Sequence, residues 1–203
     1  MRGDRMLEVL AVMLLGVATV GSAWCGYQAS KWNGQESELA RESSDLLVDS
    51  TRLFTLATQA VAYDASLVTQ YAQAYQEENT ILMEFYRASL MRPAFLPVID
   101  AWEAEVRAGR APANLLSDEA YLDAQYADFQ ATQAEAQAAS AAGQEAGDNA
   151  DAYVLTTLMF AVALFFAGVT SSFRFRSVRI VLLIGAVLAI ALAAARLVDV
   201  PIA

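Results

Sequence analysis

The stretch Val154–Val169 reads VLTTLMFAVALFFAGV, and a second apolar run, IVLLIGAVLAIALAAA, follows at Ile180–Ala195. A helix that crosses a bilayer needs about 20 predominantly apolar residues. The first run lies within 22 consecutive uncharged residues, 152–173. The second has 16 uncharged residues, and it is long enough if Arg196 extends its guanidinium to the membrane interface. The pair predicts two transmembrane helices, 152–173 and 180–198.

A third apolar run lies near the start of the sequence, where Val9–Tyr27 contains 19 residues without a charge. Its length predicts another transmembrane helix, at 6–29. The run also has the composition of a signal peptide, with small residues at Gly21–Ala23 in the place of a cleavage site. Since the run is as long as a full span, we favour a retained transmembrane helix.

The distribution of arginine predicts how these helices are oriented. The short loop 174–179 carries Arg174, Arg176 and Arg179 without an acid, and the segment 1–5 carries two more arginines. Basic loops stay in the cytoplasm. We therefore expect 1–5 and 174–179 to be cytoplasmic, and 30–151 and 199–203 to lie outside.

Overall composition excludes several kinds of chemistry. The 203 residues are 57% apolar, include no histidine and one cysteine, and carry a net charge of −10. Histidine-dependent catalysis, histidine-ligated metals and disulfide frameworks are excluded, and the acidity argues against nucleic acid as a partner. Residues 30–151 hold 20 acidic and 7 basic residues, a net of −13. We predict no cofactor, no metal site and no catalytic residues.

Helix-forming composition marks the first half of the segment between the spans. Residues 35–92 contain neither glycine nor proline, and a break is expected at 77–80, where Asn79 or Thr80 can cap a new helix. Apolar residues recur every seven positions in two adjacent rows, which predicts a packed helix. The positions beside them (Ser43, Ser50, Ala57 and Asp64) are small or polar, so we expect no tight leucine-zipper seam. The two rows are Leu39, Leu46, Leu53, Ala60, Leu67, Ala74 and Ile81, and Ala40, Leu47, Phe54, Val61, Val68, Tyr75 and Leu82.

The second half predicts a short helix followed by a long one. The short helix spans 98–108 and ends before Gly109. Ser117 is the expected N-cap of the long helix 118–151, which is rich in Ala and Gln and either continues into the next span or breaks before it. The fold class is therefore an all-α membrane protein with three transmembrane helices and a helical hairpin or bundle between the first two.

Small residues on the predicted spans mark the faces where helices pack closely, because they let backbones approach. No acidic or basic residue lies deep within the three runs, which lowers the expectation of a coupled transporter. The small residues that we assign to packing are Gly16, Gly21, Ser22, Gly26, Gly185, Ala189 and Ala193.

The exit from the first run carries a less common phrase, AWCGYQASKWNGQ at 23–35. It resembles the AW-x-x-YQA-x-x-W-x-G-x-Q phrase of an uncharacterised family of bacterial three-span membrane proteins. The resemblance implies an outer helical segment, paired later spans and a bacterial inner-membrane location, and it brings no activity or cofactor. Two interpretations stay open for its side chains: an aromatic anchor at the interface, or a surface that binds a partner or lipid headgroup. They are Trp24, Tyr27, Gln28, Trp32 and Gln35.

These observations favour a non-enzymatic membrane protein, a homo-oligomeric scaffold or an accessory subunit of a larger membrane complex that acts through its acidic helical segment. Its partners are then the lipid bilayer and other protein subunits. A sensor of extracytoplasmic ligands is one alternative, although little of the chain would reach the cytoplasm to carry a signal. A channel or transporter subunit formed by oligomerisation is the other.

Overall fold

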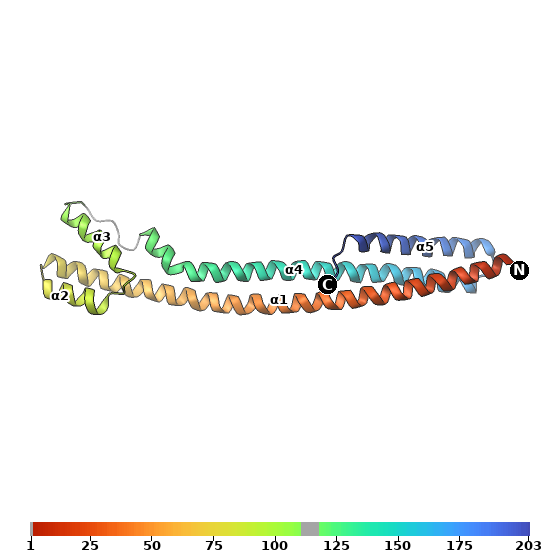
Figure 1. Ribbon diagram of the computed structural model, residues 1–203, viewed down its shortest axis with the longest axis horizontal. Coiled ribbons are helices and arrows are strands. Elements are labelled where there is room, and N and C mark those ends of the chain that lie inside the picture. The colour runs from red at the N-terminus through yellow and green to blue at the C-terminus, as the bar shows by residue number, and fades with distance from the viewer. Residues whose placement is uncertain (1, 111–117) are drawn as a thin grey trace. The chain divides into compact units, whose positions relative to one another are not determined.

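The computed structural model describes residues 2–110 and 118–203, with side chains from Arg5 onward. All secondary structure in these ranges is helical, without a strand, which confirms the predicted all-α class (Figure 1). The helices α1, α4 and α5 are each long and apolar enough to cross a membrane, as predicted. The elements are α1 (Arg2–Gln76), α2 (Thr80–Phe85), the π-helical turn η1 (Tyr86–Leu90), α3 (Leu96–Arg107), α4 (Glu119–Val169), the 3-10 turn η3 (Thr170–Ser172) and α5 (Arg176–Val198).

Both long helices run through the boundaries between the predicted spans and the segment outside. Helix α1 has 75 residues and α4 has 51, so each is continuous with its span. Gly143 and Gly147 do not break α4. A β-carbon at Gly143 would lie 3.4 Å from the Cβ of Leu39, and one at Gly147 would lie 3.1 Å from the Cδ of Glu36. The two glycines therefore keep α4 close to α1.

The ends of the shorter helices follow local capping rules. The Asn79 side chain accepts a hydrogen bond from the Leu82 amide (3.1 Å), which starts α2 where the sequence predicted a break. Gly109 follows α3 with a φ of +70°, a conformation that glycine adopts without strain. Asp118 accepts a hydrogen bond from the Tyr121 amide (2.8 Å) and caps α4. Ser117, the expected cap, lies outside the described residues.

The chain divides into two units, which we describe separately. The span unit comprises Met1–Glu42 and Ala138–Ala203, and the central unit comprises Ser43–Gln137. In the span unit α1, α4 and α5 lie side by side (Figure 1). Their core combines small side chains with two large rings: Ala18, Cys25, Ala29, Tyr153, Phe160, Ala163 and Ala193.

In the central unit the row of small and polar residues on α1, where the sequence predicted no tight leucine-zipper seam, faces α4. That row is buried: Ser43, Ser50, Ala57, Asp64 and Tyr71 are each at most 8% exposed. The Ser43 hydroxyl donates to the carbonyl of Ala136 on α4 (3.0 Å). A seam does exist, and small side chains form it because they let the two backbones come close.

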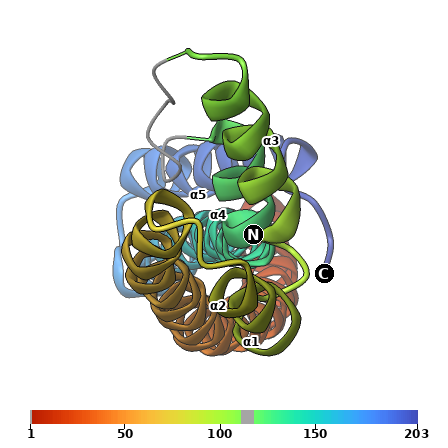
Figure 2. The same cartoon turned by 90° about the vertical axis from the view of Figure 1, so that its left-hand side faces the viewer.

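Helices α2 and α3 pack against the last part of α1 in the central unit (Figure 2). They cover the apolar rows from Val61 to Tyr75 and form a core with residues from α1 and α4. The buried members of this core are Leu67, Tyr71, Met91, Phe95, Val98, Ile99 and Tyr121.

Gly21 offers a test of close packing in the span unit. A β-carbon at Gly21 would lie 2.6 Å from Cζ of Phe160, a ring that is itself only 4% exposed. Gly21→Ala should therefore destabilise the detergent-solubilised protein by about 1–3 kcal/mol, the usual cost of overpacking. Thermal unfolding followed by tryptophan fluorescence measures this loss.

The matched control is Gly34→Ala, because a β-carbon at Gly34 meets nothing within 4 Å. It should leave stability unchanged or raise it by about 0.5–1 kcal/mol through helix propensity. Equal effects of the two substitutions would contradict the close contact at Gly21.

Candidate functional site

Two of the five residues from the phrase at 23–35 hold the segment Pro201–Ala203. The Gln28 side chain is 1% exposed, and its Oε1 accepts a hydrogen bond from the Ala203 amide (3.0 Å). The Trp32 indole donates to the carbonyl of Pro201 (3.2 Å). Tyr153 on α4 donates to the same carbonyl (3.1 Å). These three side chains therefore form a polar clasp around an extended segment that follows α5.

The other three residues of the phrase point away from this clasp. Trp24 is 46% exposed and Tyr27 is 55% exposed, and their rings lie 6.1 Å apart between centroids. Gln35 is also exposed. The predicted four-residue spacing does not place all these side chains in one site. Gln28 and Trp32 bind within the chain, whereas Trp24 and Tyr27 form an aromatic pair on its surface.

The small residues assigned to packing separate into two groups. A β-carbon at Gly185 would lie 3.2 Å from Cδ2 of Phe166, and Ala193 is completely buried. Ser22 and Ala189 are half-buried. Gly16 and Gly26 face open space, since a β-carbon at either would meet nothing within 4 Å. Any helix that packs on these two glycines comes from outside this chain.

The arginines of the predicted cytoplasmic loop also differ in their surroundings. Arg174 and Arg176 are exposed. Arg179 lies in the first turns of α5 with only 12% of its side chain exposed, and its Nη2 lies 3.4 Å from Oε1 of Glu8. The structure brings Arg179, but not its two neighbours, into contact with α1.

The most extensive polar site lies in the central unit around Asp64, whose side chain is completely buried on α1. Arg92 donates from Nε to both carboxylate oxygens (3.1 and 3.2 Å) and from Nη2 to Oδ2. Arg92 Nη2 also reaches Oε1 of Gln125 (3.0 Å), and the Tyr121 hydroxyl donates to Asp64. The Asp64 carboxylate thus accepts hydrogen bonds from Arg92, in the segment before α3, and from Tyr121 on α4.

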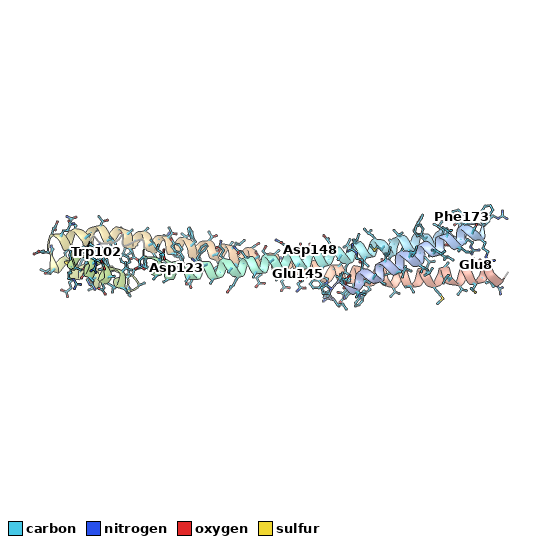
Figure 3. All side chains as sticks on the ribbon, turned by 90° about the horizontal axis from the view of Figure 1, so that it is seen from above. Glu8, Trp102, Asp123, Glu145, Asp148 and Phe173 are labelled. Atoms are coloured by element: carbon cyan, nitrogen blue, oxygen red, sulfur yellow. The ribbon has the colours of Figure 1, made fainter. Side chains whose placement is uncertain are left out.

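A second network joins Tyr71 of α1 to the short helices. The Tyr71 hydroxyl donates to Glu103 of α3, and Arg87 donates to the same carboxylate (3.0 Å) and to Asp100. The Tyr71 ring packs edge-on against Trp102, with 6.5 Å between centroids. Figure 3 places Trp102 in the cluster of side chains at these helices.

Electrostatics keep both phenols protonated as donors. Burial, reinforced by the hydrogen bond to Glu103, raises the pKa of Tyr71 to about 12. Burial and the hydrogen bond to Asp64 raise the pKa of Tyr121 further above its ordinary value. Hydrogen bonding to Asp64 raises the pKa of Arg92, which stays charged. Each of the two networks therefore combines ion pairs with a neutral phenol donor, and neither is arranged to exchange protons near neutral pH.

Sequence reasoning treated Asp64 only as one of several small or polar positions. The available signal was its place: between Ser43 and Tyr71 it is the one charged residue in the row of positions spaced seven apart. A carboxylate in a buried row needs a partner. Identifying Arg92 as that partner required the tertiary structure, because 28 residues separate the two.

Metal chemistry has no obvious location in the part of the chain that the structure describes. These residues contain no group of three or more Cys, Asp or Glu side chains arranged to hold an ion.

In comparisons with protein-family models, curated proteins and solved structures, the chain has no match. The argument about function therefore depends on the chain's own surfaces.

Asp64→Asn tests the buried ion pair. Breaking a fully buried pair costs about 3–5 kcal/mol, and because Arg92 is 31% exposed we expect a smaller loss, about 2–3 kcal/mol. Hydrogen–deuterium exchange should accelerate in residues 61–75 and 86–107 while the span unit stays protected.

Asp49→Asn is the matched control, since its ion pair with Arg52 is exposed at both ends. It should change stability by less than about 0.5 kcal/mol. An Asp64 variant with the wild-type exchange pattern would show that the pair does not hold the short helices.

Gln28→Leu tests the polar clasp. The substitution removes the acceptor of the Ala203 amide, and the net contribution of such a hydrogen bond is about 0.5–1.5 kcal/mol. Exchange of the amides in 199–203 should rise by about tenfold, as measured by hydrogen–deuterium exchange of the solubilised protein. Gln35→Leu removes an exposed glutamine and should leave that exchange unchanged; a rise in both variants would refute the specific clasp.

Proposed function

We propose that this protein is a non-enzymatic membrane scaffold or accessory subunit that assembles through its acidic helical segment. In this proposal it spans a bacterial inner membrane three times, with the arginine loop in the cytoplasm and residues 30–151 outside as a helical hairpin. Three sufficiently apolar helices and the arginine distribution support the topology. The phrase at 23–35 supports the bacterial assignment.

One observation carries the assembly proposal: an uncharged face of α1 that the short helices do not cover. Helices α2 and α3 shield the apolar rows from Val61 onward. Before that point Leu47 is 49% exposed, Val48 is 73% exposed and Phe54 is 45% exposed. These three residues, with Thr51, Thr55 and Thr58, lie at helical spacings of three and four, and we call them the uncharged face.

Charge placement favours this face as a contact surface. Of the nearby charged residues, Asp49 lies on the opposite side of the helix by its spacing, and Asp45 and Arg52 lie at the edge of the uncharged face beside Val48. A segment that carries a net charge of −13 thus keeps one face free of charge. Two like-charged copies can meet there while their acidic groups stay apart.

The hydroxyl groups on the uncharged face already have partners. Thr51 donates to the carbonyl of Leu47 (2.9 Å), and Thr55 donates to that of Thr51 (2.9 Å). Thr58 lies 3.4 Å from the hydroxyl of Tyr126. A partner helix can therefore cover these residues without leaving buried hydroxyl donors unsatisfied, and burial of the apolar side chains supplies a driving force.

The occupant that we propose for the uncharged face is a second copy of the chain. Two helices that meet over a seam of small residues cover little area on their own, and a second hairpin would complete a four-helix arrangement. The exposed Gly16 and Gly26 offer further helix contacts within the bilayer in the same assembly.

Val48→Glu tests the assembly. Placing a carboxylate in a dry contact should weaken self-association by at least about tenfold. Light scattering coupled to size-exclusion chromatography, together with native mass spectrometry of the detergent-solubilised protein, should show an oligomer for the wild type and a shift to monomer for the variant.

Leu56→Glu is the matched control, because Leu56 is 51% exposed and lies outside the uncharged face, one turn beyond Arg52. It should assemble like the wild type. A wild-type protein that is a monomer without a co-purifying partner, or equal behaviour of the two variants, would overturn the proposal.

A further inference from the structure

Arg179 has a hydrogen-bond donor that the fold leaves without a partner. Its Nε is buried and makes no hydrogen bond to any described residue. Among the described residues its hydrogen-bonding contact is a long one, 3.4 Å from Nη2 to Oε1 of Glu8, whose side chain is 61% exposed. Buried polar groups of a protein are nearly always paired, so an unpaired guanidinium N–H indicates a missing acceptor.

Arg179 also lines a cavity of about 190 Å³ in the span unit, and its shielded Nε reaches this space when the side chain turns. The cavity lies between the first part of α1, the end of α4 with η3, and the start of α5. Figure 3 shows Glu8 and Phe173, the residue after η3, at the same end of this unit. Its walls combine one guanidinium, one carboxylate and two hydroxyls with small or apolar residues: Glu8, Ala11, Val12, Leu15, Ala167, Gly168, Thr170, Ser171 and Arg179.

We propose that this cavity binds the phosphate group of an anionic phospholipid. Guanidinium groups suit phosphate because their planar donors match its oxygens, and a turn of the Arg179 side chain presents its unused Nε–H. Val12 and Leu15 offer an apolar wall to the glycerol and the first acyl carbons. In the orientation proposed above, the cavity lies at the cytoplasmic leaflet, where anionic lipids gather.

The surroundings favour an anion despite the nearby carboxylate. Arg174 and Arg176 lie in the adjoining loop and raise the local positive potential. The Thr170 and Ser171 hydroxyls donate to the carbonyls of Phe166 and Gly168, so they do not compete for Arg179. Glu8 opposes an anion, and its mostly exposed side chain can turn toward solvent when the phosphate binds.

Native mass spectrometry of the full chain in detergent provides the test, with phosphatidylglycerol titrated against phosphatidylcholine of the same acyl chains. We expect one phosphatidylglycerol site that binds at least about tenfold more tightly than phosphatidylcholine. Arg179→Gln should abolish this preference, and Arg176→Gln, which removes the same charge from an exposed site, should retain it within about twofold.

Two further variants separate the donor from the charge. Arg179→Lys keeps the positive charge but lacks the Nε–H, so it should bind about threefold to tenfold more weakly than the wild type. Glu8→Gln removes the opposing carboxylate and should tighten binding. Helix content by circular dichroism identifies any variant that fails to fold. If Arg179→Gln does not fold, Arg179→Lys takes its place as the test of the lipid site.

Three results would overturn the proposal: equal binding of the two lipids, an Arg179→Lys variant indistinguishable from the wild type, or equal losses in Arg179→Gln and Arg176→Gln. Inorganic phosphate that displaces the lipid at equal concentration would assign the site to a free anion instead. The lipid site and the oligomer are measured independently, because Val48→Glu should retain the phosphatidylglycerol preference.

Discussion

The close approach of α1 and α4 is the constraint on which the remaining features depend. In the central unit it relies on the buried small residues Ser43, Ser50 and Ala57 of α1 and Ala136 of α4. In the span unit it relies on Ala139, Gly143, Ala146 and Ala150 of α4, which are also buried. Small side chains bring the two backbones together, so the helices are held by dispersion contacts between backbones rather than by the large apolar side chains of a leucine zipper. The larger residues Leu47 and Phe54 are thereby displaced to the flank of the seam.

Where this seam ends, a buried ion pair links α1 to the neighbouring helices. Asp64 continues the row of small residues, and its burial is compatible with folding only because Arg92 and Tyr121 satisfy it. The same residues connect α1 to the segment after η1 and to α4. The buried ion pair therefore fixes the position of the short helices. Burial of the apolar core around Phe95 and Ile99 supplies the stabilisation.

The span unit follows a different physical rule. Its outward side chains are apolar, with Val20 70% exposed, Phe165 63% exposed and Leu192 62% exposed. In a bilayer these residues face lipid, which is as apolar as they are, and packing inside depends on fit rather than on expulsion of water. Polar groups of this unit consequently appear at its ends, where Gln28 and Trp32 bind Pro201–Ala203 and where Arg179 lines its cavity.

The sequence by itself determined the helical class, the three apolar helices and the break at Asn79, because chain composition and local capping control these features. It also marked the apolar rows of α1, yet not which row faces inward. That choice belongs to the tertiary structure, in which the Ser43 row of α1 faces α4 and the Ser43 hydroxyl bonds to the carbonyl of Ala136. Pairings such as Asp64 with Arg92 likewise join residues far apart in the chain, and the contact itself depends on how the helices pack, which no local pattern encodes.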